Sequence, residues 1–346
     1  MRKDDDPARQ RDRETLPPMQ ALTLLTPLEF FDDFRSQAAR AESRIWLQVM
    51  QVRQGERVEG LFDAVYDRTL AMGQEGVALD TRFRFDGFTL SRTKHIDGMF
   101  DKFEGIATID YINRLGPLEQ FFPNTGRSHV KLFIVDNVAY IGGMNLADAN
   151  FYQIDCMLKI TDPRIVDELA RVYDDLGKDR PHYDEETRCT PDTSILVDGG
   201  NVGQSIILQR GVEMVRGARE SVDFLSQYYP DGPMLGALHE TRRRGILTRA
   251  VVAQERSDSY GQVSTVLHEL SNFVSDGNEG KLPLDRISRG VHGKFLRADE
   301  RVLIGSHNLT ILGVLAGTEE IALYSSDPEL VAQSREFIDR TIRGEM

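Results

Sequence analysis

The chain carries one residue pattern twice, and this duplication restricts the possible folds more than any other feature of the sequence. Each copy has a His, a Lys two positions later, an Asp five positions after the Lys, and an Asn that follows the His by 16 positions. The copies start at His129 and His292, which are 163 residues apart. Only about 0.015 chance matches to the His-x-Lys-x4-Asp part are expected in a chain of this composition. The equal spacings therefore indicate one structural unit that is present twice.

The segments before each copy predict the same order of elements in both halves. Apolar residues at helical spacing are followed each time by an apolar run of strand length. The expected helix and strand pairs are 30–43 with 45–50, 61–74 with 77–85, 212–219 with 224–229, and 234–244 with 246–253. Gly76 and Gly245 follow the second helix of each half, where a left-handed glycine commonly ends a helix.

Strands that alternate with helices imply right-handed crossovers and sheets with parallel strands. The predicted fold class is therefore α/β, with two duplicated domains packed with pseudo-twofold symmetry. Each domain is expected to be a mostly parallel mixed sheet flanked by helices. The predicted domains span 19–190 and 191–346. Residues 1–18 mix five basic with five acidic residues and little apolar content, so they are predicted to be a disordered leader.

The repeated residues combine two imidazoles with two ammonium groups. Together they can supply a nucleophile, a proton donor and positive charge that stabilises an anionic group. His129 and Lys131 are two apart on an expected strand and so share a face, and His292 with Lys294 repeats this arrangement. No His, Cys and Asp cluster has zinc spacing and no glycine-rich phosphate loop is present, so neither a metal nor a cofactor is predicted.

These residues resemble the HKD signature of the phospholipase D superfamily, in which two copies meet to form one phosphodiester-cleaving site. Several segments are similar to bacterial cardiolipin synthases: Gly142-Gly143-Met144-Asn145, Asp155-Cys156-Met157-Leu158-Lys159-Ile160 and Tyr228-Tyr229-Pro230-Asp231. The resemblance implies two phospholipase D-like domains and a phosphohistidine intermediate. It makes His129 the nucleophile and His292 the general acid and base, although the duplicated sequence does not distinguish the two roles.

The same resemblance implies roles for four further polar residues and for two carboxylates. Phosphate oxygens would be held by Lys131, Lys294, Asn145 and Asn308. Each imidazole needs a carboxylate to fix its tautomer. Asp155 and Glu319 follow the two His by 26 and 27 residues, and we expect them to do this. The second assignment is less regular, because Gly317 stands where the family has Asn and Glu320 lies next to Glu319.

Other residues near the motifs receive mainly structural interpretations. Asp136 and Asp299 fit a turn or salt-bridge role about as well as a direct one. His307 is expected to point away from the site. The remaining imidazoles match no pattern and are assigned to core or surface; they are His95, His182, His239 and His268. Cys156 and Cys189 are interpreted as free thiols in a reducing compartment.

Composition bears on location and partners. No run of about 18 apolar residues exists and no apolar signal core opens the chain, so a cytoplasmic protein is predicted. A lipid substrate would then require peripheral docking at the inner face of the membrane, for which Phe121-Phe122 or Tyr228-Tyr229 could serve if they are not core residues.

The leading functional hypothesis is a phospholipase D-type phosphodiesterase or phosphatidyltransferase that acts on a phospholipid, with an alcohol or water as acceptor. The alternative is an HKD-type nuclease or another phosphodiesterase acting on nucleic acid. The segment from Gly305 to Thr310 also resembles nuclease members, but a net charge of −13 opposes nucleic acid as a partner. The intact motifs argue against a noncatalytic binding module. The headgroup, the acceptor and the oligomeric state are left open.

Overall fold

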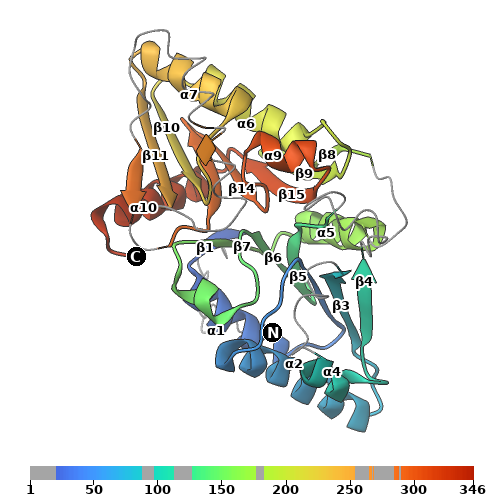
Figure 1. The fold of residues 1–346 in the computed structure, drawn as a ribbon. Coiled ribbons are helices and arrows are strands. Elements are labelled where there is room, and N and C mark those ends of the chain that lie inside the picture. Colours follow the sequence, from blue (N-terminus) through green and yellow to red (C-terminus); the bar gives the residue numbers. More distant parts are fainter. Residues whose placement is uncertain are drawn as a thin grey trace, which may run out of the picture.

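The computed structural model describes residues 21–87, 97–112, 127–176, 183–253, 265–266, 268, 284–287 and 290–346. The predicted leader, the Phe121-Phe122 pair, His95 and His182 lie outside these residues. The chain forms two halves, each a twisted sheet with helices, and the two halves are stacked on one another (Figure 1).

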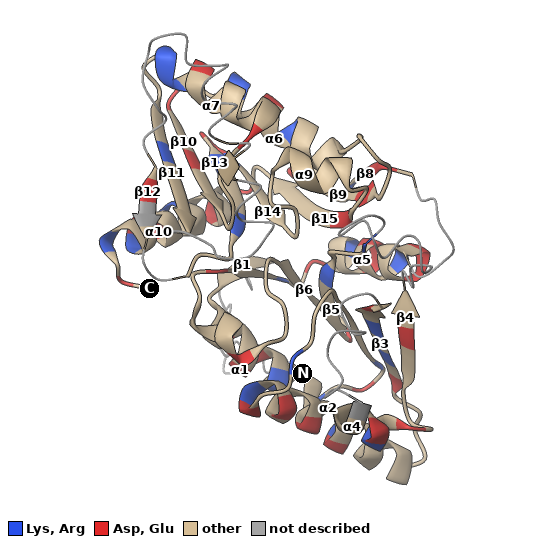
Figure 2. Cartoon of the chain, in the orientation of Figure 1, with Lys and Arg blue, Asp and Glu red and all other residues tan. Residues whose placement is uncertain are grey.

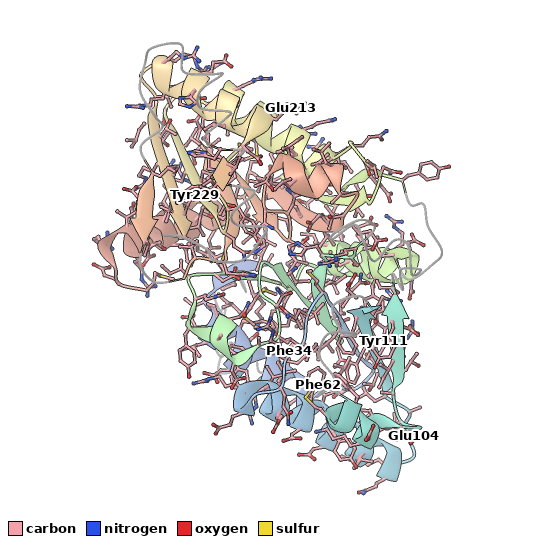
Figure 3. The ribbon with its side chains drawn as sticks, viewed as in Figure 1. Phe34, Phe62, Glu104, Tyr111, Glu213 and Tyr229 are labelled. Carbon is pink, nitrogen blue, oxygen red and sulfur yellow. The ribbon has the colours of Figure 1, made fainter. Side chains whose placement is uncertain are left out.

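The first half is built on a seven-stranded sheet. In spatial order its strands are β1 (Leu22–Leu25), β7 (Met157–Ile160), β6 (Val138–Gly142), β5 (Lys131–Val135), β2 (Arg44–Val49), β3 (Asp80–Asp86) and β4 (Thr108–Ile112). Its helices are α1 (Pro27–Ala38), α2 (Glu56–Gln74), α4 (Asp97–Phe100) and α5 (Pro163–Leu176), with the 3-10 turns η2 (Asp101–Phe103) and η4 (Asp148–Tyr152). Phe34 and Phe62 carry the apolar stripes of α1 and α2 onto the outer face of this sheet (Figure 3).

The second half is built on an eight-stranded sheet. Its strands are β12 (Asp285–Ile287), β11 (Leu247–Ala253), β10 (Ser221–Ser226), β13 (Lys294–Ala298), β14 (Arg301–Gly305), β15 (Glu319–Ser325), β9 (Thr193–Gly199) and β8 (Glu185–Arg188). Its helices are α6 (Ile206–Gly217), α7 (Gly232–Arg243), α9 (Ile311–Leu315) and α10 (Pro328–Arg343). Helices α6 and α7 cover the outer face, in the way that α1 and α2 cover the first sheet (Figure 1).

The α/β class and the paired architecture are confirmed, but the expectation of mostly parallel sheets is wrong. Among the described strands, β2, β3 and β4 are parallel, as are β10, β11 and β12, while every other neighbouring pair is antiparallel. The cause is that the motif strand of each half turns back at once as a hairpin, β5 with β6 and β13 with β14. A buried apolar run has the same pattern in both kinds of sheet, so the sequence did not reveal these reversals.

The motif aspartates form the turns of these two hairpins. Asp136 and Asp299 have positive φ angles of 48° and 51°. The carboxylate of Asp136 accepts hydrogen bonds from the backbone N–H groups of residues 42, 43 and 44, and that of Asp299 accepts from residues 219, 220 and 221. Of the two roles left open for these residues, the geometry therefore supports the turn role in both copies.

One apolar core connects the halves. It contains Trp46 and Ile134 from the first sheet and Phe295 and Ile321 from the second, together with residues of α5 and α10. Helix α10 also reaches the first half directly, because the side chain of Gln333 bonds to the backbone of β1. Strand β8 precedes the predicted boundary at residue 190 but belongs to the second sheet.

Candidate active site

The two motif histidines lie just before the first residues of β5 and β13, and both line one cavity of about 490 Å³ between the halves. Neither imidazole is open to bulk solvent, since the side chains of His129 and His292 are 13 % and 7 % exposed. Residues that are 163 apart in the sequence are thus brought together, as the duplicated motif predicted.

Two equivalent backbone bridges hold these histidines at the junction of the halves. Glu319 of the second half donates its N–H to the carbonyl of Arg127, and its own carbonyl accepts from the N–H of His129; both distances are 2.9 Å. Ile154 of the first half is bonded in the same way, to the carbonyl of Gly290 at 2.8 Å and the N–H of His292 at 2.9 Å. The bridges place residue 319 in the second half where residue 154 stands in the first.

Each imidazole contacts a carboxylate from the opposite half. Nδ1 of His292 lies 2.7 Å from Oδ2 of Asp155, and Nδ1 of His129 lies 3.0 Å from Oε2 of Glu320. A carboxylate on Nδ1 keeps the proton there and leaves the Nε2 lone pair available to a substrate. The partners are exchanged between the halves, whereas the offsets in the sequence had suggested a partner within each repeat.

Glu320, and not Glu319, occupies the position that corresponds to Asp155. In the first sheet Gly142 pairs with Met157, which follows it by 15 residues, and in the second sheet Gly305 pairs with Ala322, which follows it by 17. The two additional residues accompany helix α9, which replaces the short turn η4. The offset counted from His292 therefore pointed to Glu319, which is one residue before Glu320, the counterpart of Asp155. The carboxylate of Glu319 belongs to the opposite face of β15, because side chains alternate along a strand.

Small residues make room for these carboxylates. A Cβ on Gly143 would lie 2.6 Å from Oδ1 of Asp155, which is closer than atoms can approach. The second copy has Ser306 at this place, and its hydroxyl donates to Oε2 of Glu320 at 2.5 Å. The two small residues before each Asn therefore make room for the pairs of a histidine and a carboxylate, which we call the dyads.

The motif lysines are buried beside the imidazoles. Nζ of Lys131 donates to the carbonyl of His129 at 2.6 Å, and Nζ of Lys294 donates to the carbonyl of His292 at 2.5 Å. Lys294 also bonds to Oε1 of Gln227 at 3.5 Å. Each ammonium group therefore lies beside the imidazole of its own motif, where its positive charge would attract a bound anion.

The two motif asparagines have side-chain acceptors that a ligand with donor groups could satisfy. Within the described residues, the side-chain oxygens of Asn145 and Asn308 are buried and have no hydrogen-bond partner. Asn145 lines the cavity of about 490 Å³ with both histidines. Asn308 lines an adjoining cavity of about 220 Å³ that also contains His129. Their amide groups are therefore positioned to bind a polar molecule in the two cavities.

Burial and the lysines lower the pKa of both motif imidazoles. Desolvation followed by the charges of Lys131 and Lys294 places the pKa of His129 well below its usual value. For His292, desolvation and then Lys294 lower the pKa to about 3, although the hydrogen bond to Asp155 acts in the opposite direction. Burial and the charge of Lys294 therefore outweigh the effect of the Asp155 carboxylate on the pKa of His292. An anionic phosphate would offset the lysine charges and raise both pKa values.

A third imidazole, that of His307, lies in this region, although it was expected to point away from the site. His307 is 4 % exposed and lines the smaller cavity together with His129. Its Nδ1 accepts the N–H of Leu309 at 2.7 Å. The useful signal was a difference between the copies, since Met144 occupies the corresponding place in the first motif.

Several other residues considered in the sequence lie away from the two motif histidines. His239 and His268 are buried, and His268 stacks on Tyr229, which is itself only 8 % exposed and therefore a core residue (Figure 3). Cys156 and Cys189 are free thiols. Within the described residues, no group of three or more His, Cys, Asp or Glu side chains has a metal-binding arrangement, and no helix is long and apolar enough to span a bilayer.

Comparison with known proteins agrees with this geometry. The family model described as cardiolipin synthase, PLD-like domain matches residues 212–342. The phosphatidylserine synthase of Haemophilus influenzae Rd KW20 has a similar fold, with a TM-score of 0.70 and 14 % identity over 93 % of this chain and 86 % of that chain. The polyphosphate kinase of Porphyromonas gingivalis gives a TM-score of 0.53 and 17 % identity over 92 % of this chain but 49 % of that chain, so the present chain spans about half of that kinase. No curated protein matches the sequence.

These comparisons agree with the predicted resemblance in the second half of the chain and confirm the predicted fold. The assignment of individual site residues stays a prediction that rests on the geometry described above.

Proposed function

We propose that this chain belongs to the phospholipase D superfamily, and that it is a phosphatidyltransferase or phospholipase D-type hydrolase that acts on a phospholipid through a phosphohistidine intermediate. The observation that carries the proposal is the pair of exchanged His–carboxylate contacts around one cavity, with a buried lysine beside each imidazole. This arrangement supplies a nucleophile, a proton donor and charge stabilisation from the side chains alone.

In the first step, Nε2 of His129 attacks the phosphorus, and the bond from phosphorus to the leaving oxygen breaks. His292 gives its proton to that oxygen. The negative charge that accumulates on the phosphoryl oxygens is stabilised by Lys131 and Lys294, and by the amide groups of Asn145 and Asn308. Glu320 keeps the proton of His129 on Nδ1 during the attack and stabilises the positive ring that forms.

In the second step, neutral His292 removes a proton from the incoming alcohol or water, which attacks the phosphohistidine from the side of the departed group. The bond between phosphorus and Nε2 of His129 then breaks and both imidazoles return to their starting forms. Asp155 holds the ring of His292 in the orientation and tautomer that both proton transfers require. The roles of the two imidazoles follow the resemblance to the superfamily.

A lipid substrate is supported by the description of the matching family model and by the acidity of the chain. Lys and Arg residues are scattered among Asp and Glu over both halves (Figure 2). Nucleic-acid binding depends on neutralising many phosphates, which a chain with a net charge of −13 is poorly suited to do. We place the enzyme at a membrane surface by peripheral contact.

The test uses purified chain with phosphatidylglycerol vesicles, with and without added glycerol or ethanol. Mass spectrometry of the lipids should show phosphatidic acid from hydrolysis, and a new phosphatidyl alcohol when ethanol is present. His292→Asn should be inactive in the same assay. Cleavage of a fluorescent single-stranded DNA without any lipid turnover would replace this proposal by the nuclease alternative.

A further inference from the structure

The reaction cavity has two parts that correspond to one another by the pseudo-twofold relation of the halves. The first part is the cavity of about 220 Å³ that contains Arg127 and His307, which we call the arginine lobe. The second is the cavity of about 490 Å³ that contains His292, which we call the amide lobe after its many Asn and Gln side chains; Arg53 and Asp148 also line it. Both lobes are lined by Met50, His129 and Tyr228, so they are contiguous at the nucleophile.

Equivalent positions in the lobes can be compared because the backbone bridges fix the correspondence. The carbonyls of Arg127 and Gly290 accept the equivalent hydrogen bonds of the two bridges, so these residues are counterparts. Because Glu319 and Ile154 occupy equivalent positions in the two bridges, the residues before them, Thr318 and Gln153, are counterparts as well. A Cβ on Gly290 would lie 3.3 Å from Cγ of Gln153, so in the amide lobe a neutral amide side chain packs against the glycine. In the arginine lobe a guanidinium side chain accompanies the smaller Thr318 instead.

The second difference is the imidazole of His307, whose counterpart is Met144. Because Nδ1 of His307 accepts the N–H of Leu309 at 2.7 Å, the neutral ring carries its proton on Nε2. Leu309 holds a φ of 56°, a left-handed conformation that is strained for leucine, and this turn brings its N–H to the imidazole. Met144 is a fully buried core residue of the first half.

The remaining groups around His307 and the dyads show where the charge of the two lobes differs. Nε2 of His307 lies 3.9 Å from Oδ2 of Asp198, a carboxylate that already accepts from Ser205 and from the backbone at the start of α6. Glu320 in one lobe is matched by Asp155 in the other, and Asn308 is matched by Asn145. At these corresponding positions, the arginine lobe thus has one guanidinium and one imidazole where the other copy has Gly290 and the buried Met144. Elsewhere the amide lobe has its own ionic side chains, Arg53 and Asp148.

We propose that the arginine lobe binds a second anionic oxyacid group, next to the phosphoryl group that His129 attacks. Arginine is the side chain best suited to a phosphate or carboxylate, because its planar donors match two oxygens at once. The inference rests on the proposed function, and narrows its substrates to those in which either the donor or the acceptor carries a second anion.

The direct test measures binding without turnover, by calorimetric titration with inorganic phosphate and inorganic pyrophosphate. The wild-type chain should bind pyrophosphate at least about tenfold more tightly than phosphate, which is the lower range for an added charge-assisted hydrogen bond. Arg127→Gly and His307→Met introduce the residues that the amide lobe carries, and each should remove most of this preference. Arg216→Ala, which removes an exposed positive charge from α6, is the matched control and should retain it.

Arg127→Lys keeps the charge without the fork and should retain an intermediate preference, so the test does not depend on a glycine variant that could fold poorly. Thermal unfolding of every variant identifies loss of structure. A wild-type chain with equal affinity for the two anions would overturn the inference. A pyrophosphate preference that survives in both folded variants, Arg127→Gly and His307→Met, would do so as well.

Two kinetic comparisons distinguish the donor from the acceptor as the source of the second anion. One compares diacylglycerol pyrophosphate with phosphatidylglycerol as donor, and the other compares glycerol 3-phosphate with glycerol as acceptor. In one of the two comparisons, kcat/KM for the substrate with the second anion, divided by kcat/KM for the substrate without it, should fall about tenfold or more in Arg127→Gly. Loss of this effect in both comparisons, with lipid turnover intact, overturns the subsite and leaves the proposed function standing. A pyrophosphate preference that depends on Arg127, without any lipid turnover, supports the subsite and removes the lipid function.

Discussion

The change of Glu320 to Gln tests the exchanged dyad most sharply. The carboxylate of Glu320 is buried and accepts hydrogen bonds from Nδ1 of His129 at 3.0 Å and from the hydroxyl of Ser306 at 2.5 Å. Gln has the same shape, so the strand and the cavity should be retained. Its amide NH2 group, however, can donate toward Nδ1, and this contact favours the tautomer with the proton on Nε2. The lone pair that should attack phosphorus is then lost.

Two effects set the expected size of the loss. Removing a hydrogen bond to a charged group costs about 1.5–3 kcal/mol, which corresponds to about 10- to 150-fold in rate. Reversal of the imidazole tautomer is more severe, since the equivalent amide substitution in a Ser-His-Asp triad lowers kcat by about 10⁴-fold. We therefore expect kcat of Glu320→Gln to fall by about 10² to 10⁴, with a much smaller change in KM.

Glu319→Gln is the matched control, because the substitution is the same and the residue is adjacent and equally buried. Its bridge to His129 uses only backbone groups, which the change does not alter. It should keep kcat within about fivefold of the wild type, as expected for a residue outside the dyads. The assay is steady-state release of p-nitrophenol from bis-p-nitrophenyl phosphate, with circular dichroism to confirm folding. Loss of activity in Glu319→Gln and its retention in Glu320→Gln would refute the assignment of the dyad.

Three further predictions follow from other parts of the structure. His129→Asn should form no covalent phosphoryl adduct with an activated p-nitrophenyl diester, whereas His292→Asn should still form some because that leaving group needs no proton; intact-mass measurement decides, and the opposite pattern reverses the two roles. Activity should persist in excess EDTA, since the charge stabilisation is assigned to Lys131 and Lys294, and complete loss that one added divalent ion restores would contradict this. Partial burial alone would raise the pKa of Asp136, but hydrogen bonds from the Ser43 side chain and from neighbouring backbone N–H groups lower it. The ionised carboxylate therefore stabilises the folded protein at pH values above its unfolded pKa, which is near 3.9. This stabilisation is lost as the pH falls through the lower pKa of the folded state. Asp136→Asn should therefore cost about 1–3 kcal/mol of unfolding free energy at pH 7, and urea titration should show a smaller difference from the wild type near pH 2.

Local patterns predicted the helices and strands of the fold well, because their signals lie within short windows. Helix α2 ends at Gln74 before Gly76, and helix α7 ends at Arg243 before Gly245, and both glycines have the expected positive φ of 78°. The direction of the motif strands was not predictable in this way. It depends on the hairpin turns at Asp136 and Asp299, whose residue type is also compatible with other roles.

In the candidate site, too, features with a local sequence pattern were predicted, and features that depend on packing were not. The motif residues were found from their spacing, since equal intervals between the copies reflect equal positions in two folded units. The partner of His129 was missed because helix α9 adds two residues between paired strands, and an offset in the sequence does not count insertions. The exchange of carboxylates between the halves, and the position of His307, depend on how the two sheets pack, which no local pattern records.

The exchanged contacts of Asp155 and Glu320 have a consequence for when the enzyme becomes competent during its synthesis. The first half to leave the ribosome carries His129 and Asp155, but each is the partner of a residue that has not yet been made. Glu320 follows His129 by 191 residues, so the nucleophile is oriented only after most of the second half has been made. A folded but undocked half would have no oriented imidazole and could not attack cellular phosphodiesters. A shorter chain with a single motif could build the same site by pairing with a second copy, each lending its carboxylate to the other.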